Sequence, residues 1–81
     1  MPLSQAVRDR LVRESQEKAQ DEFFRAEFFR LGGPSHLTLS LPLVILDCLR
    51  TGDTAEAEYF KELLANSEET EQILASTHGL M

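Results

Sequence analysis

The chain carries EFFRAEFFRL at residues 22–31, a five-residue motif repeated with one change, and GGP follows at residues 32–34. On a helical wheel that advances about 100° per residue, the four phenylalanines spread over roughly 240°. A helix that packs only within its own domain needs an apolar arc somewhat wider than about 100°. The motif therefore predicts that a second surface covers part of this helix.

We predict that the motif forms an interface with a second copy of the chain or with a stable partner. Aromatic side chains dominate interfaces because each ring buries a large area at low entropic cost. The alternative is that the phenylalanines only form the core of a monomeric helical bundle. The predicted interface residues are Phe23, Phe24, Phe28, Phe29 and Leu31.

A long N-terminal helix is predicted to lead into the motif. Ser4 is a suitable N-cap, and helix-favouring residues follow without Gly or Pro as far as Leu31. An unbroken helix over residues 4–31 is about 42 Å long, whereas a compact domain of this size is about 30 Å wide. The helix would therefore extend into solvent or lie along another subunit, and the GGP sequence would end it.

The next stretch is predicted to be extended and then helical. Residues 36–41 alternate leucine with polar residues, which is the pattern of a half-buried extended segment. Pro42 suits the first turn of a helix over residues 41–50 that Gly52 ends. Apolar residues surround most of this helix, so it should be the central buried element, with Cys48 as an unreactive buried thiol.

The last third of the chain predicts a pair of helices. Asp53 and Glu56 have the spacing of a capping box at the start of the first of these helices. Asn66 and Ser67 are predicted to break the chain before a final short helix that ends near Ala75.

The whole chain, residues 1–81, is thus predicted to be one all-α domain of three to four helices. Its elements are a long N-terminal helix, a buried central helix and a C-terminal helical pair, with a short extended segment at residues 36–41. Residues 1–5 and 77–81 are expected to fray. The lone cysteine, the lack of an apolar run of about 20 residues and the lack of a secretory signal predict a cytoplasmic location without membrane contact.

The formal net charge of −6 lies entirely in residues 32–81, because residues 1–31 hold six basic and six acidic side chains. An acidic surface repels phosphate backbones, so nucleic-acid binding is not expected. It attracts a basic patch on a protein partner. We predict that Glu58, Glu62 and Glu69 are exposed and steer such a partner; the alternative is that the acidity only aids solubility.

The sequence carries no pattern of a catalytic, metal or cofactor site. His36 and His78 are far apart and lack the ligand spacing of a zinc or iron site. No glycine-rich phosphate loop is present, and Cys48 has no activating base beside it. We therefore predict no enzymatic activity, no cofactor and no bound metal.

One resemblance bears on function. LTLSLP at residues 37–42, followed by a helix, a glycine-containing turn and a second helix, is similar to the ribbon-helix-helix repressors over roughly residues 36–66. The resemblance implies a dimer that reads the major groove with outward strand residues, here Thr38 and Ser40. Those positions are not basic in this chain, and the region around them is acidic.

The sequence favours a small acidic protein–protein interaction module without enzymatic activity. Such a module would be an adaptor, an inhibitor or a chaperone-like factor that acts as a homodimer and binds a further protein, for example one with a basic patch. The alternatives are a dimeric ribbon-helix-helix-like transcription regulator and a small docking subunit of a larger assembly.

Overall fold

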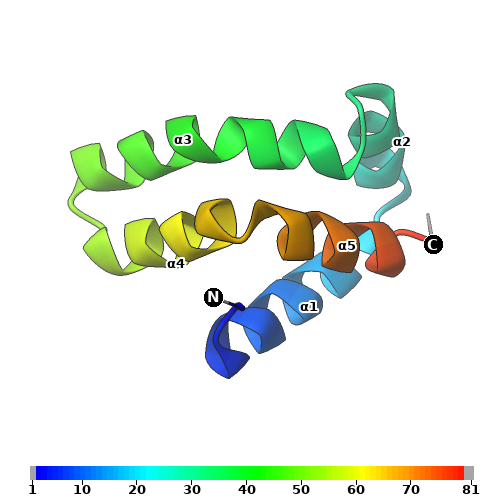
Figure 1. Ribbon diagram of the computed structural model, residues 1–81. Helices are drawn as coiled ribbons and strands as arrows, with labels where there is room; N and C mark the ends of the chain where they lie inside the picture. Colours follow the sequence, from blue (N-terminus) through cyan, green and yellow to red (C-terminus); the bar gives the residue numbers. More distant parts are fainter. Residues whose placement is uncertain (1, 80–81) are drawn as a thin grey trace.

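The computed structural model describes residues 2–79 and forms five helices with no strand in that range (Figure 1). The helices are α1 (Gln5–Ala19), α2 (Glu22–Arg30), α3 (Pro34–Thr51), α4 (Thr54–Ala65) and α5 (Ser67–Thr77). The all-α class is confirmed, although the chain forms more helices than the three to four that the sequence predicted.

The helices form three layers. α4 and α5 follow one another along the middle of the molecule, with α3 on one side of them and α1 on the other (Figure 1). α3 packs against both α4 and α5, whereas α1 packs mainly against α5. α2 crosses one end of the bundle and connects the two outer layers.

The predicted long helix over residues 4–31 is wrong, because the chain breaks at Gln20 and Asp21 into α1 and α2. Asp21 has an extended backbone, and its carboxylate accepts a hydrogen bond from the Phe24 N–H at 3.0 Å, so it acts as a new N-cap. The break turns α2 across the bundle. The resulting molecule measures 32 × 25 × 19 Å, and no helix extends beyond it.

The predicted extended segment is also wrong, because residues 36–41 belong to α3, a helix of 18 residues. Two of the polar residues in the alternating pattern bond within the helix. The Thr38 hydroxyl donates to the carbonyl of Pro34 at 3.2 Å, and the Ser40 hydroxyl donates to the carbonyl of His36 at 3.0 Å. The pattern therefore does not require a strand, and the ribbon of a ribbon-helix-helix protein is absent from residues 2–79.

α3 begins at Pro34 rather than at Pro42. Gly33 caps the helix with φ 72° and ψ −146°, a backbone conformation that glycine adopts readily. Pro34 then occupies the first turn. The N–H groups of a first turn have no partner within the helix, so the N–H that proline lacks costs no helical hydrogen bond. Pro42 lies inside the helix on its exposed side, so the prediction that it starts a helix is wrong.

The other predicted helix boundaries are confirmed. The Ser4 hydroxyl caps α1, and the Asp53 carboxylate caps α4 by accepting the Glu56 N–H at 3.1 Å. Gly52 ends α3 with a left-handed φ of 85°. Asn66 separates α4 from α5.

Residues near both ends of the described chain are buried, and the expected fraying of residues 1–5 and 77–81 stays a prediction. Leu3 is only 5 % exposed and belongs to the core, and His78 is only 3 % exposed. Thr77 still lies within α5. The expectation of frayed ends at residues 1 and 80–81 falls outside the described residues.

The core forms where the three layers meet. Its fully buried apolar residues are Leu3, Leu11, Phe28, Leu41, Tyr59, Leu63 and Leu74. α3 contributes Leu41 to this core and buries Ile45 on the same side. The prediction of a buried central helix is therefore wrong, because α3 is an outer layer that is buried on one side only.

Candidate interaction surface

The outer side of α3 carries four exposed leucines, which we call the leucine face. Leu39, Leu43, Leu46 and Leu49 are 78, 71, 62 and 43 % exposed. They recur at i, i+4, i+7 and i+10, a spacing that places them along one side of a helix. The opposite side of α3 packs on α4 and α5, so α3 is apolar on a side that nothing in the described chain covers.

The leucine face carries no net formal charge. Asp47 and Arg50 are the only formally charged residues of α3, and Arg50 Nη2 lies 2.5 Å from Asp47 Oδ1. Large apolar patches on a soluble protein mark sites of association, and charged residues are depleted at the centre of such sites. By these criteria the leucine face is the best candidate for an interaction surface.

The phenylalanine motif is divided between the core and the surface. Its inner half consists of Phe28, which is buried, and Phe24, which is half-buried. The Phe28 ring stacks on the His78 ring with 4.3 Å between the ring centroids. The centroids of the Phe28 and Phe24 rings are 6.1 Å apart. These rings fill the end of the bundle where α2 meets the C-terminal residues of α5.

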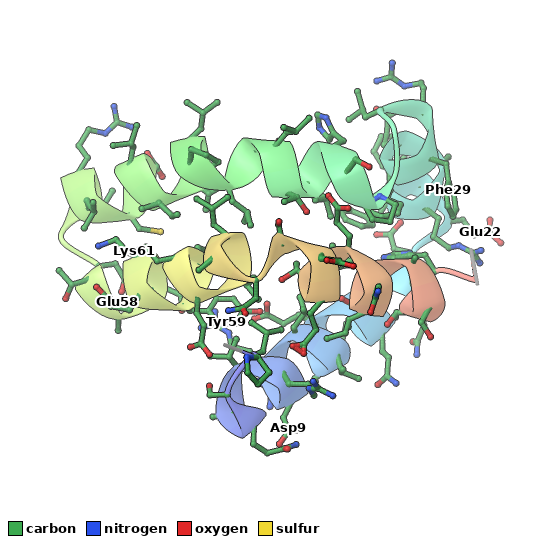
Figure 2. All side chains as sticks on the ribbon, viewed as in Figure 1. Asp9, Glu22, Phe29, Glu58, Tyr59 and Lys61 are labelled. Carbon is green, nitrogen blue, oxygen red and sulfur yellow. The ribbon has the colours of Figure 1, made fainter. Side chains whose placement is uncertain are left out.

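The outer half of the motif faces solvent. Phe23 is 78 % exposed, and Leu31 and Phe29 are partly exposed. Figure 2 shows Phe29 on α2 at the end of the bundle. The five predicted interface residues therefore do not form one continuous surface. The apolar arc of the motif is therefore wide because it serves two environments. Its inner half fills the core of the same chain, and its outer half remains uncovered.

Of the three predicted steering residues, only Glu58 is fully exposed, and it lies near Lys61 on α4 (Figure 2). Lys61 Nζ and Glu58 Oε1 are 3.4 Å apart, a surface pair that contributes little to stability.

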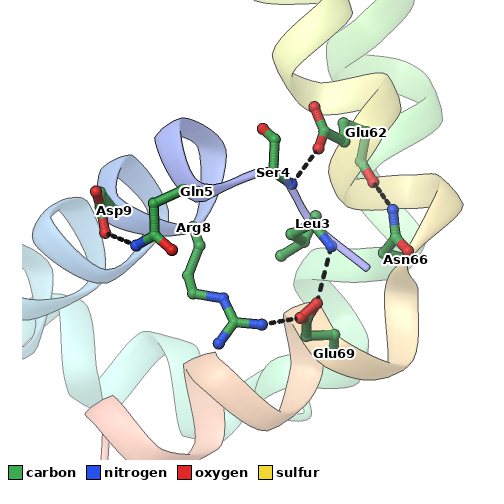
Figure 3. A network of polar contacts seen from close by, with 8 residues as sticks. All are labelled: Leu3, Ser4, Gln5, Arg8, Asp9, Glu62, Asn66 and Glu69. Carbon is green, nitrogen blue, oxygen red and sulfur yellow. Dashed lines mark hydrogen bonds and ion pairs between the residues drawn. The ribbon is translucent and has the colours of Figure 1, made fainter. Parts of the chain in front are cut away.

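Glu62 and Glu69 instead hold the N-terminal segment, which corrects the expectation that they are exposed (Figure 3). The Ser4 N–H donates to Glu62 Oε1 at 2.6 Å, and the Leu3 N–H donates to Glu69 Oε1 at 3.0 Å. Arg8 also forms an ion pair with Glu69. These two glutamates therefore fasten the start of α1 to α4 and α5.

A polar cluster between α1 and α4 was not predicted. Arg10 Nε lies 2.9 Å from Glu14 Oε1, and Arg10 Nη2 lies 2.7 Å from the Glu56 carboxylate. The guanidinium carbon lies 3.9 Å from the centroid of the Tyr59 ring, which is packed between the two helices (Figure 2). From the sequence, only the i,i+4 spacing of Arg10 and Glu14 is visible. Glu56 and Tyr59 belong to α4 and reach the cluster only through the packing of α4 against α1.

The electrostatics of this cluster make it a structural link and not an acid–base pair. The hydrogen bond from Arg10 lowers the pKa of Glu56, and the hydrogen bond to Glu56 raises the pKa of Arg10. Burial, followed by the charge of Glu14, raises the pKa of Tyr59. Arg10, Glu56 and Tyr59 therefore keep their usual neutral-pH charges, and none of these three is poised to exchange a proton near pH 7.

The described residues offer no metal site, since no three His, Cys, Asp or Glu side chains cluster in residues 2–79. In the same range, no helix is both long enough and apolar enough to cross a membrane. Cys48 is half-buried instead of fully buried. Partial burial and the carboxylates of Asp53, Glu56 and Asp47 raise the pKa of its thiol, which disfavours the reactive thiolate.

His78 is the buried polar residue with an unmet hydrogen bond. Its Nδ1 is buried and has no hydrogen-bond partner in the described part of the chain. Burial, followed by the charge of Arg25, lowers the pKa of His78. The imidazole is therefore neutral at pH 7 and packs as an aromatic ring among the phenylalanines.

We expect the unfolding free energy to fall as the pH drops through about 6.5, the pKa of an unfolded histidine. Because the folded-state pKa of His78 is lower, the unfolded chain binds more protons in this window, and protonation favours unfolding. His78→Phe keeps a ring against Phe28 but removes the titration. Urea unfolding between about pH 5 and 8 should show that the unfolding free energy of the wild type falls more steeply with decreasing pH than that of the variant. Equal pH dependence of the two proteins would contradict a lowered pKa of His78.

Comparisons of the chain with protein families, with curated proteins and with solved structures gave no match.

Proposed function

We propose that the chain is a small acidic protein–protein interaction module without enzymatic activity, and that it acts as a homodimer joined through the leucine face of α3. The observation that supports this proposal is the row of exposed leucines at Leu39, Leu43, Leu46 and Leu49. The ribbon-helix-helix alternative is not carried further, because the segment that would form its ribbon is helical.

The exposed area of the leucine face fits a reversible dimer. Exposures of 78, 71, 62 and 43 % together equal about two and a half fully exposed leucines per copy. Burying a leucine side chain contributes about 1.5–3 kcal/mol, so two copies gain on the order of 10 kcal/mol. Association costs about 4–15 kcal/mol, which is of the same size. A dimer that exchanges with folded monomers is therefore expected, and not an obligate dimer.

Charge favours this face for self-association over the rest of the surface. Two copies with a formal charge of −6 each repel one another wherever their acidic residues meet. The acidic residues of the second half lie mainly on α4 and α5, which pack on the opposite side of α3 from the leucine face. Contact through α3 therefore keeps the acidic surfaces of the two copies apart.

A dimer formed in this way leaves other surfaces available for a further protein. Phe23 and Phe29 of α2 remain exposed, as does Glu58 of α4. Phe29 and Glu58 lie at opposite ends of the molecule (Figure 2), so α2 offers an apolar contact and Glu58 offers a separate acidic contact that suits a basic patch, as an adaptor or inhibitor would require.

We expect sedimentation equilibrium at about 100 μM to give a mass above the 9.2 kDa of one chain, and this mass should rise toward twice that value with concentration, because the estimated gain and cost of association nearly balance. The double variant Leu43→Glu/Leu46→Glu should be a folded monomer, since it places charges at the centre of the interface. Phe23→Glu is the matched control, because it charges an equally exposed apolar residue outside the leucine face and should leave the dimer intact.

Two outcomes would contradict the proposed interface. If Phe23→Glu dissociates the dimer and the double variant does not, self-association occurs through the α2 motif. If the wild type is monomeric at this concentration, the leucine face serves a different protein, as in the docking-subunit alternative.

A further inference from the structure

A groove opens between the two outer layers, with α4 and α5 as its floor. Its volume is about 490 Å³, and side chains from all five helices line it. Most of the exposed area of the lining is apolar, with contributions from Leu11, Leu37, Leu41, Val44, Phe60 and Leu74, although about half of the lining residues are polar or charged. Sites for small molecules are typically apolar clefts of about 300–1,000 Å³ with a few polar groups, and many lie between helices.

The groove is too large to be a packing defect. A dry apolar cavity of about 150 Å³ holds one benzene molecule. A groove of 490 Å³ is about three times as large. By this measure it suits a molecule with on the order of 15–20 non-hydrogen atoms.

The charges at the rim indicate which chemical group the ligand carries. At one end, Arg10 is occupied by its ion pairs with Glu14 and Glu56. Lys18 also lines the groove, and it forms no ion pair within residues 2–79. Glu17 shares the rim with Lys18 and offsets its formal charge, and together with Arg10, Glu14 and Glu56 the ionisable lining carries a net formal charge of −1. Lys18 is thus the cation of the lining that an anionic ligand group can pair with.

Lys18 lies directly beside the apolar part of the groove. Its Nζ is 5.5 Å from the centroid of the Phe24 ring, and that ring lines the groove. The His78 ring, whose Nδ1 has no partner, lines the same end with its centroid 6.1 Å from that of Phe24. A molecule whose charged end reaches Lys18 would therefore place its apolar body between α1 and α3.

We propose that this groove binds a small amphipathic molecule with an apolar body and a single anionic group, such as a medium-chain carboxylate. The apolar walls supply the affinity, and Lys18 selects the negative charge. This site is separate from the leucine face, because Val44 and Leu41 point to the groove side of α3 while the leucines lie on its outer side.

The probe is dodecanoate, titrated below its micelle concentration into ¹⁵N-labelled protein, with 1-dodecanol as a neutral counterpart. We expect saturable shifts of amides that line the groove, with a dissociation constant on the order of 100 μM. Val44→Phe fills the groove and should weaken dodecanoate binding at least tenfold, while circular dichroism shows a retained fold. Absence of dodecanoate binding to the wild type, or unchanged binding to folded Val44→Phe, would overturn the proposal.

Two further variants test the charged end and the location of the site. Lys18→Gln should weaken dodecanoate about fivefold or more and leave dodecanol unchanged, whereas Arg13→Gln, an exposed residue of α1 outside the groove, should change neither. Equal effects of Lys18→Gln on both probes would overturn the role of Lys18. The monomeric variant Leu43→Glu/Leu46→Glu should still bind dodecanoate; loss of binding there would place the ligand on the leucine face.

Discussion

Phe28→Ala should lower the unfolding free energy by about 3–5 kcal/mol, the usual cost of removing a buried phenylalanine ring. Phe28 is 3 % exposed, and its ring stacks on His78 at 4.3 Å. Removing the ring leaves a cavity where α2 closes the end of the bundle. A domain of this size has about 4–12 kcal/mol of stability in total, so the variant should be close to unfolding at 25 °C.

Phe23→Ala is the control from the same motif. Phe23 is 78 % exposed, so its replacement should change the unfolding free energy by less than about 0.5 kcal/mol. Urea unfolding followed by circular dichroism measures both variants, at one protein concentration because the proposed dimerisation would add stability by mass action. Similar losses for the two variants would contradict the division of the motif between core and surface.

The double variant Glu62→Ala/Glu69→Ala should cost about 2–4 kcal/mol, because hydrogen bonds to charged groups contribute roughly 1.5–3 kcal/mol each and these are partly exposed to solvent. It removes the acceptors of the Leu3 and Ser4 N–H groups and the ion-pair partner of Arg8. We expect the start of α1 to separate from α4 and α5. Hydrogen exchange should then accelerate in α1 before it does in α3 or α4.

Glu58→Ala is the matched control for that variant. Its carboxylate is exposed and pairs only with Lys61 at the surface, so its loss should change stability by less than about 0.5 kcal/mol. If Glu58→Ala and the double variant leave α1 equally protected from exchange, the fastening of the N-terminal segment by Glu62 and Glu69 is wrong.

The sequence was sufficient for features that depend on a few neighbouring residues. The caps at Ser4 and Asp53, the glycine stop at Gly52 and the break at Asn66 were all predicted, because each needs only local hydrogen bonds or a local backbone conformation. The all-α class follows from the same local signals.

The errors arose where two local structures were comparable and packing decided between them. Asp21 can continue a helix, although it is a modest helix former, or it can cap a new one. The packing of α2 across the end of the bundle favours the cap. The alternating leucines near residue 39 fit a strand, yet the same residues supply a buried and an exposed side of α3. Periodicity could not show which side would be covered.

The candidate sites were the least predictable part of the structure. The sequence correctly indicated excess apolar surface near the phenylalanine motif, but it did not indicate that the largest uncovered row lies on α3. The groove and the Arg10 cluster join residues from α1 and α4 that are distant in the chain. Only the packing of the layers brings them together.

The packing of α1 against α5 also constrains the order of events on the ribosome. α1 finds its main partner in α5, which is synthesised after α2, α3 and α4. At about 5–20 residues per second, several seconds pass between the synthesis of the two helices. During that interval Leu11 lacks its final environment, whereas α3 and α4 can already pair as a hairpin. The nascent chain thus completes its three layers only after translation of α5, when α1 closes onto a partly assembled fold.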